Sequence, residues 1–196
     1  QYLTTYLQSE ESDVIYGGYQ IKRNDEKYQH NLRYIFECIG TQNADYKQRQ
    51  ANPYGDFHTS NFIAKRSIML KYPFDERFFH YGYEDVLWGK TLKDNEISIH
   101  HVDNPLGYEH FIGNMSFINK TEEACRTLYE FRKELSGYSK LIHYAELSKR
   151  LKIVYPLVRF LYPELSMQIK AQLLGNNPSV FLFNIYKLLY YMHLNL

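Results

Sequence analysis

Several features that identify a class of protein are scarce in this sequence of 196 residues. It has two cysteines, Cys38 and Cys125, which lie far apart and belong to no cluster with metal-ligand spacing. Free thiols of this kind are typical of a reducing compartment, and we therefore expect a cytoplasmic protein. The formal net charge is only +1 and there is no dense block of lysine and arginine, which argues against nucleic acid as a partner.

Long apolar runs are also absent from the sequence. No stretch reaches the ~20 apolar residues that are needed to span a bilayer. The opening residues, Gln1 to Thr5, are polar and lack the basic region of a secretory signal. The charge is unevenly distributed, because residues 138–196 carry a formal +5 and the remainder −4. An acidic body followed by a basic, apolar tail predicts two parts with different roles.

The first 118 residues alternate between strand and helix patterns, which predicts an α/β domain. β-branched and aromatic residues predict strands over 13–21, 62–64 and 97–102. Two glycines interrupt the first of these strands. Helices are expected within 1–11, 32–39, 66–71 and 84–94. The segment 41–59 is rich in Asn, Gln, Asp and Gly and is predicted to be a long surface loop.

Residues 119–196 are predicted to form a helical appendage. Asn119 followed by Glu122 is typical of a capping box, and its helix is expected to run to Gly137. Further helices are expected over 139–155, 163–174 and 178–192. Pro178 suits the first position of the last helix, which is apolar nearly all round. We expect that helix to be buried in the rest of the protein, in a homodimer or in a membrane interface.

The adjacent acids Glu84 and Asp85 are the strongest candidate for chemistry. They follow the aromatic turn Tyr81-Gly82-Tyr83 and open the helix predicted over 84–94. Carboxylates in the first turn of a helix are stabilised by its exposed N–H groups, by about 0.3–1 kcal/mol. At least one of them therefore stays ionised near neutral pH and is able to take a proton. The alternative is that both acids only cap the helix.

The stretch from Ser60 to His110 resembles the C-terminal half of a family 2 glycosyltransferase with the Rossmann-like GT-A fold. The pieces that carry this resemblance, in order, are Ser60-Asn61-Phe62-Ile63-Ala64-Lys65-Arg66, Phe74-Asp75-Glu76-Arg77-Phe78, Gly82-Tyr83-Glu84-Asp85 with Gly89, Asp103-Asn104-Pro105, and His110.

The resemblance implies a role for each matching residue. Asp85 would be the general base that deprotonates the acceptor hydroxyl, and Glu84 would hold the acceptor or tune the base. The acceptor side would include Ser60, Asn61 and Gly82, with Tyr81, Tyr83 and Trp88 offering flat faces to sugar rings. Each aromatic residue has packing in the core as its alternative.

The resemblance also implies a divalent cation, Mn²⁺ or Mg²⁺, which such enzymes hold on the donor diphosphate through an Asp-x-Asp motif. This sequence has no Asp-x-Asp. Asp56 and His58 have an Asp-x-His spacing, but they lie too late in the chain and are interpreted as a chance match. His110 takes the position of the family's metal or diphosphate ligand. His100 and His101 are poorer candidates, because strand alternation points them to opposite faces.

The matching region covers only half of such an enzyme, and we expect the chain to be a fragment of a longer protein. It would supply the acceptor site and the base, and would hold the cation weakly or not at all. The implied partners are a nucleotide-sugar donor and a glycan acceptor, in bacterial polysaccharide assembly. The basic tail would allow peripheral contact with the inner face of the plasma membrane. The alternative function is a non-catalytic carbohydrate-binding or scaffolding module.

Overall fold

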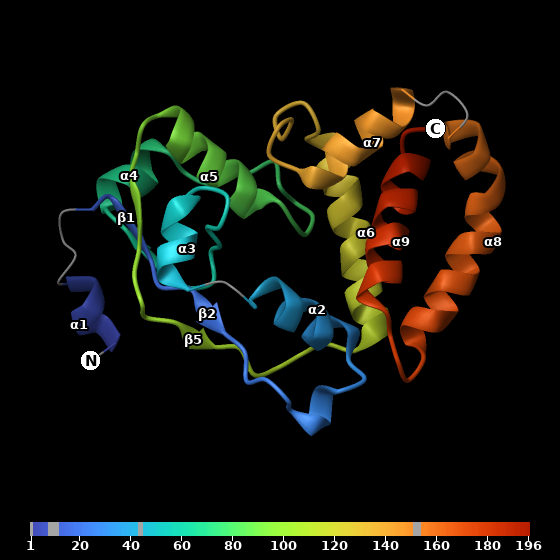
Figure 1. The fold of residues 1–196 in the computed structure, drawn as a ribbon. Coiled ribbons are helices and arrows are strands. Elements are labelled where there is room, and N and C mark those ends of the chain that lie inside the picture. Colours follow the sequence, from blue (N-terminus) through green and yellow to red (C-terminus); the bar gives the residue numbers. More distant parts are fainter. Residues whose placement is uncertain (1, 8–11, 43–44, 151–153) are drawn as a thin grey trace. The chain divides into compact units, whose positions relative to one another are not determined.

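A computed structural model describes residues 2–7, 12–42, 45–150 and 154–196 of the chain. They form a mixed α/β structure (Figure 1), which confirms the α/β class. Its elements are α1 Tyr2–Leu7, β1 Val14–Tyr16, β2 Tyr19–Gln20, η1 Glu26–Tyr28, α2 Leu32–Gly40, α3 Tyr46–Ala51, β3 Phe62–Ala64, α4 Arg66–Lys71, α5 Glu84–Asp94, β4 Ile99–His101, β5 Leu106–Gly107, α6 Asn114–Glu130, α7 Lys140–Arg150, α8 Val154–Leu174 and α9 Val180–His193.

The chain divides into two compact units that are each discontinuous in sequence. The first consists of Gln1–Arg23, Cys38–Phe79 and Tyr83–His110. The second consists of Asn24–Glu37, His80–Gly82 and Phe111–Leu196. The sequence predicts a single boundary after residue 118, whereas the chain crosses between the units several times because Asn24–Glu37 and His80–Gly82 belong to the helical unit.

A three-stranded sheet organises the first unit. β1 lies in the middle, antiparallel to β3 and parallel to β4. All three residues of β1 are buried, as expected for a strand covered on both faces. β2 and β5 form a separate parallel pair. The strands predicted over 13–21, 62–64 and 97–102 are therefore confirmed, although the last is shorter.

Two glycines interrupt the first predicted strand because other groups come too close for a side chain. A Cβ on Gly17 would lie 2.3 Å from the Tyr6 hydroxyl. Gly18 has φ +80°, and a Cβ there would lie 2.6 Å from Cζ of Arg49. Glycine at both positions allows the side chains of Tyr6 and Arg49 to approach the backbone where the chain leaves the sheet.

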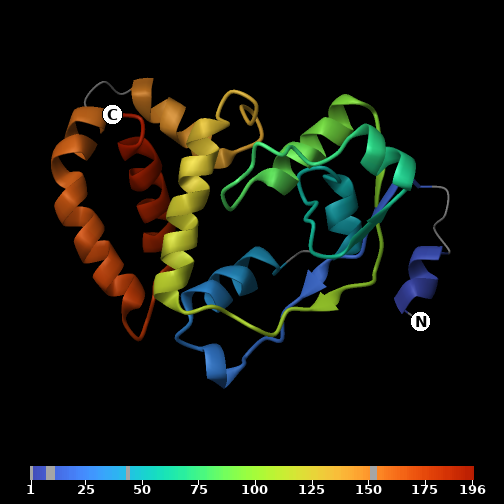
Figure 2. The ribbon, with the colours of Figure 1, turned by 180° about the vertical axis from the view of Figure 1, so that it is seen from behind.

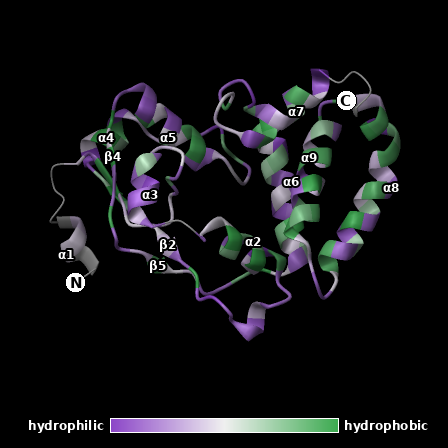
Figure 3. Ribbon diagram, in the orientation of Figure 1, coloured by the Kyte–Doolittle hydropathy of each residue, from purple (hydrophilic) through white to green (hydrophobic). Residues whose placement is uncertain are grey.

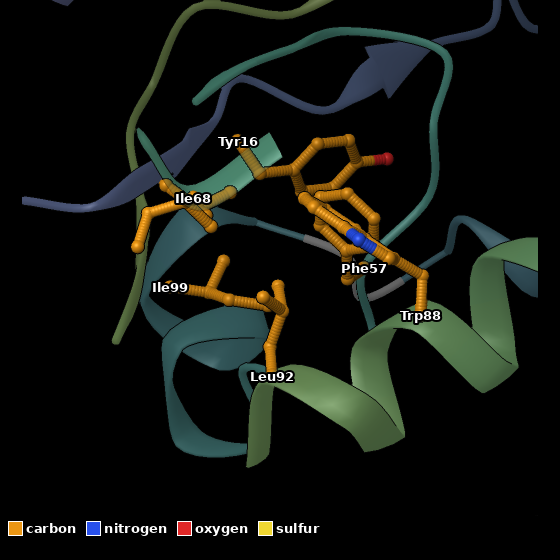
Figure 4. Close-up of a cluster of buried hydrophobic side chains, with 7 residues drawn as sticks. Tyr16, Phe57, Ile68, Trp88, Leu92 and Ile99 are labelled. Carbon is orange, nitrogen blue, oxygen red and sulfur yellow. The ribbon is translucent and has the colours of Figure 1, made fainter. Parts of the chain in front are cut away.

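Buried aromatic and aliphatic side chains cover the sheet of the first unit. They are Val14, Tyr16, Phe57, Ile68, Trp88, Leu92 and Ile99. Figure 4 draws seven buried side chains of this cluster and labels six of them, with Trp88 and Leu92 projecting from α5. The ring centroids of Phe57 and Trp88 are 5.3 Å apart, and those of Tyr16 and Phe57 are 5.5 Å apart. Tilted contacts of this kind strengthen a core beyond simple area burial.

The segment 41–59 is not the continuous loop that the sequence predicted, because it contains α3. Asp45 caps this helix, accepting a hydrogen bond from the backbone N of Gln48 at 2.8 Å. The helix has no apolar periodicity. It is held to the sheet by a buried arginine, Arg49, which composition alone could not identify as an interior residue.

The second unit is a helical bundle. α9 packs against α6, α7 and α8, and Figures 1 and 2 show α8 and α9 running side by side. Hydrophobic residues line these helices (Figure 3). Buried residues of α9 include Phe183, Tyr186, Tyr191 and Met192. One face of this apolar helix is therefore buried within the bundle, whereas Phe181 on the same helix is 71 % exposed.

Three predicted helix boundaries in this unit are wrong. α6 begins at Asn114 instead of Asn119, because Phe117 and Ile118 are buried and extend the helix toward its N-terminus. It ends at Glu130, seven residues before Gly137. α8 starts at Val154 and continues through Pro163, since its flanking turns are buried in the bundle at Val158 and Ile169.

The start of α9 also differs from the prediction. Ser179 is its N-cap and accepts a hydrogen bond from the backbone N of Leu182 at 3.3 Å. Pro178 therefore precedes the cap instead of opening the helix, and a serine hydroxyl satisfies an N–H group there that proline could not. Among the described helices, none is both long and apolar enough to cross a membrane.

Replacement of Gly82 by alanine should destabilise the protein. Gly82 has φ +102°, and an added Cβ would lie 2.8 Å from Cβ of Ala124 on α6. We expect the free energy of unfolding to fall by about 1–3 kcal/mol in urea titrations. Gly113→Ala is the control, because an added Cβ there meets nothing within 4 Å. Equal losses in the two variants would contradict this interpretation.

Candidate active site

The acids Glu84 and Asp85 lie in the first turn of α5, as predicted. Tyr83 precedes them in the left-handed conformation, with φ +69°, and its carbonyl accepts the first helical bond from the N of Leu87 at 3.0 Å. This turn points the exposed N–H groups of the helix toward the carboxylates. Oδ1 of Asp85 accepts from the backbone N of Val86 at 2.8 Å.

The other oxygen of Asp85 contacts a histidine that lies 27 residues earlier in the sequence. Nδ1 of His58 is 3.1 Å from Oδ2 of Asp85. Two tyrosine rings make edge-type contacts with this histidine, with centroid distances of 6.4 Å to Tyr16 and 6.1 Å to Tyr19. The carboxylate side chain is 20 % exposed and the imidazole 47 %. The pair is thus ordered and accessible to a ligand.

Glu84 has a buried oxygen whose bonding is incomplete. Its Oε2 atom is shielded from solvent and has no hydrogen-bond partner among the described residues. A buried carboxylate oxygen without a donor is unfavourable by several kcal/mol. Such an atom is expected where a ligand completes the site.

A cavity of about 280 Å³ is lined in part by His58, the partner of Asp85. Its wall includes the side chains of Tyr16, Tyr19, Gln48, Arg49, Asp56 and His58. This volume is at the lower end for small-molecule sites. The wall carries hydrogen-bond donors and acceptors next to aromatic surface, which suits a small ligand with many hydroxyl groups. A second cavity, of about 430 Å³, shares Tyr19 and Arg49 with the first.

Arg49 supports the floor of the cavity. It is 7 % exposed, and its NH2 group donates to the carbonyls of Gly17 at 3.2 Å and Val102 at 3.1 Å. Its guanidinium lies 5.5 Å from the ring centroid of Tyr16. Carbonyl dipoles and an aromatic face together stabilise a cation that has left water.

His101 completes this arrangement on β4. Its Nδ1 accepts from Nε of Arg49 at 3.4 Å, and its Nε2 is 2.9 Å from the carbonyl of Pro53. Burial lowers the pKa of His101 below its usual value, and the charge of Arg49 acts in the same direction. The imidazole is therefore neutral, with its proton on Nε2.

The structure places the other predicted site residues in different roles. The Ser60 side chain forms a hydrogen bond with the Tyr16 hydroxyl, beside the cavity. Asn61 is 4 % exposed, and its amide donates to the carbonyls of Gly18 and Asn104 at 2.6 and 2.8 Å. Its Oδ1 accepts from the Tyr6 hydroxyl. We therefore correct the assignment of Asn61 from substrate binding to holding the sheet edge.

Trp88 also needs correction as a sugar-binding surface. It is buried in the core of the first unit (Figure 4), and its indole N–H donates to the carbonyl of Tyr72 at 2.7 Å. Its ring packs against that of Phe74, with centroids 4.9 Å apart. The packing alternative therefore holds for Trp88, because its faces are covered.

Tyr81 and Gly82 belong to the second unit. The backbone N of Tyr81 donates to Oε1 of Glu123 at 3.1 Å, and its carbonyl accepts from Oγ1 of Thr127 at 3.0 Å. The Tyr81 ring is exposed and lies 5.0 Å from Nζ of Lys120. These hydrogen bonds to α6 hold the backbone of Tyr81 in the aromatic turn.

The histidines considered as metal ligands are dispersed. His110 is exposed, and on β4 His100 is exposed while His101 is buried, which confirms that strand neighbours face opposite ways. In the part of the chain that the structure describes, no group of three or more His, Cys, Asp or Glu side chains is placed to hold a metal ion.

Sequence reasoning missed three residues of this site. His58 was weighed only as a metal ligand beside Asp56, and Tyr16 and Arg49 were not identified. The proximity of His58 to Ser60-Asn61 in the chain was the only available signal. Nothing local could show that His58 meets Asp85, because the contact depends on how β3 and α5 pack.

Comparison of the chain with protein-family models, with curated proteins and with solved structures gives no match. A functional proposal is therefore built on the residues of this chain and on the short motifs described above.

The buried state of His101 should make stability depend on pH. Its pKa is lowered in the folded protein, whereas in the unfolded chain it titrates near its ordinary value of about 6.5. Below that pH the unfolded state binds a proton that the folded state excludes. The free energy of unfolding should therefore fall with decreasing pH, by at most about 1.4 kcal/mol per pH unit.

Urea titrations from neutral to mildly acidic pH measure this slope. His101→Gln should flatten it, and the exposed neighbour variant His100→Gln should not. A slope that is the same in all three proteins would exclude His101 as its source.

Trp88→Ala should reduce the free energy of unfolding by about 3–5 kcal/mol, because it empties an aromatic core position. Phe79→Ala is the matched control, since Phe79 is 86 % exposed and should change stability by less than about 0.5 kcal/mol. Chemical denaturation measures both. If the Trp88→Ala protein were as stable as the control, Trp88 would not be a core residue, and its ring would be a candidate for stacking on a sugar.

Proposed function

We propose that this chain carries the acceptor site and the base of an inverting, nucleotide-sugar-dependent glycosyltransferase. The observation that supports it most is the placement of the Asp85 carboxylate. It lies in the first turn of α5 and contacts His58 at 3.1 Å, and His58 lines a cavity suited to hydroxyl groups. The ordered motifs from Ser60 to His110 support the same reading, and they also support the finer assignment to part of a GT-A domain.

The proposed reaction is a single displacement. The acceptor hydroxyl loses its proton to the base that contains Asp85 as its oxygen attacks the anomeric carbon of the donor. The new C–O bond forms on the face opposite the leaving group. The bond to the diphosphate oxygen breaks, and its electron pair leaves with the nucleoside diphosphate. One displacement inverts the anomeric configuration.

Electrostatics support a base at this position. The helix N-terminus favours the ionised form of a carboxylate in the first turn. The N–H of Val86 contacts Oδ1 of Asp85, and the imidazole of His58 contacts Oδ2, so that both carboxylate oxygens are held. A group fixed in this way reacts without first reorganising its surroundings.

Donor binding has less support from the described residues. His110 is a single exposed histidine and does not make a cation site with its neighbours. The described residues therefore do not fit a divalent cation by themselves, and no step is assigned to one. The resemblance supports a nucleotide-sugar donor and a divalent cation, and the formal charge of +5 over residues 138–196 supports contact of the tail with a membrane surface.

Asp85→Asn should reduce sugar transfer by ~10²–10⁴-fold, the usual contribution of a positioned acid or base. The measurement is release of nucleoside diphosphate from a panel of UDP-sugars with an oligosaccharide library, in the protein that contains this chain. Asp94→Asn is the matched control, because Asp94 ends the same helix in an exposed ion pair with Lys90. It should keep near-normal turnover.

Near-normal turnover of the Asp85→Asn protein would refute the assignment of the base. If saccharides bind to the wild-type chain but no transfer is found with any donor, the non-catalytic carbohydrate-binding alternative is favoured instead.

A further inference from the structure

We infer that the 280 Å³ cavity is the subsite for one neutral sugar unit of the acceptor, and that His58 is the group that takes the proton from it. Asp85 then acts through His58 as a positioning carboxylate. This inference rests on the proposed transferase function. It adds a catalytic residue that the motif resemblance does not contain, because the resemblance begins at Ser60.

The two side chains differ in their relation to the cavity. His58 forms part of the cavity wall, and Asp85 does not. Asp85 instead lies against the ring nitrogen Nδ1 of His58, at 3.1 Å. An acceptor sugar in the cavity therefore meets the imidazole before it meets the carboxylate.

This contact determines which nitrogen of His58 is basic. A carboxylate accepts hydrogen bonds but does not donate them when it is ionised. Nδ1 of the neutral imidazole therefore carries the proton and donates it to Asp85. The lone pair is then on Nε2, and that atom is the one able to accept a proton. Serine hydrolases use the same division of roles between an aspartate and a histidine.

Other groups near His58 favour the charged state that follows proton transfer. Asp85 is in direct contact, and Asp56 is on the same cavity wall. Two nearby carboxylates stabilise an imidazolium ion by Coulomb attraction. The Tyr16 and Tyr19 rings lie near the imidazole in edge-on geometry, with centroids 6.4 and 6.1 Å away.

The proton balance of the step is complete. The acceptor O–H bond breaks and its proton goes to Nε2 of His58. The freed electron pair on oxygen forms the bond to the anomeric carbon, and the pair of the old bond leaves with the donor diphosphate. Asp85 keeps its charge throughout and holds the Nδ1 proton of the imidazolium.

The wall chemistry identifies the ligand as neutral and rich in hydroxyl groups. Gln48 offers both a donor and acceptors, Asp56 offers acceptors, and Tyr19 offers aromatic surface. The guanidinium of Arg49 already donates to two backbone carbonyls. Asp56 and the guanidinium of Arg49 give this wall one charge of each sign, so the wall has no net attraction for a phosphate or carboxylate group. A sugar ring fits this wall better than the nucleoside diphosphate of the donor does.

The first test is the tautomer of His58, which does not depend on any activity. Ring ¹⁵N chemical shifts, recorded at a pH of about 8.5 where imidazoles are neutral, should show the proton on Nδ1. Asp85→Ala removes the acceptor and should shift His58 toward the Nε2–H form. The exposed His100 serves as the internal control and should not respond. A proton on Nε2 in the wild-type protein would overturn the inference.

The second test separates the base from the function. In the protein that contains this chain, UDP release is compared for His58→Gln, Asp85→Asn and the double variant, with the UDP-sugar panel. If the two residues form one base, each single variant loses ~10²–10⁴-fold and the double variant loses little more. His100→Gln, on the exposed face of β4, should keep wild-type rates.

The outcomes are distinguishable. A His58→Gln protein within about twofold of wild type, beside a large loss in Asp85→Asn, would refute the pair and leave Asp85 alone as the base. Independent losses that multiply in the double variant would also refute it. No loss in either single variant would refute the proposed function itself.

Discussion

The burial of the Arg49 guanidinium is the interaction on which the first unit depends. Arg49 joins α3 to the ends of β1 and β4 through the carbonyls of Gly17 and Val102. Its size requires a glycine at position 18. Its Nε also donates to Nδ1 of His101. A cation that is removed from water needs all of these partners, and they in turn determine where the chain must turn.

The candidate site follows from this framework. The turn after β1 positions Tyr16 and Tyr19, and α3 supplies Gln48 and Arg49 to the same cavity. The segment after α3 then brings His58 to the first turn of α5. Residues from 16–19, 39–41, 48–49 and 56–58 thus line one cavity, and the contact of His58 with Asp85 joins its wall to the first turn of α5. The buried charge of Arg49 and a core of aromatic rings support the residues of the site.

The helical unit follows a simpler rule. α9 is apolar on nearly all sides, and it packs against α6, α7 and α8. One polar cluster of this bundle is paired: the hydroxyl of Tyr186 donates to Oε1 of Glu122, which also meets Lys170 at 2.6 Å. Burial raises the pKa of Tyr162, near this cluster, to about 12, so the phenol is neutral at physiological pH. The bundle is stabilised by apolar packing around a small, satisfied polar group.

The sequence by itself determined the elements with strong local signals. Periodicity placed α2 and α5, β-branched residues placed β1 and β3, and the acids Glu84 and Asp85 were correctly put at the start of a helix. Tertiary structure alone decided which side chains meet. His58 reaches Asp85, Arg49 makes a polar segment helical, and Trp88 is covered by its neighbours. Such contacts depend on long-range packing, and local propensity contains no information about them.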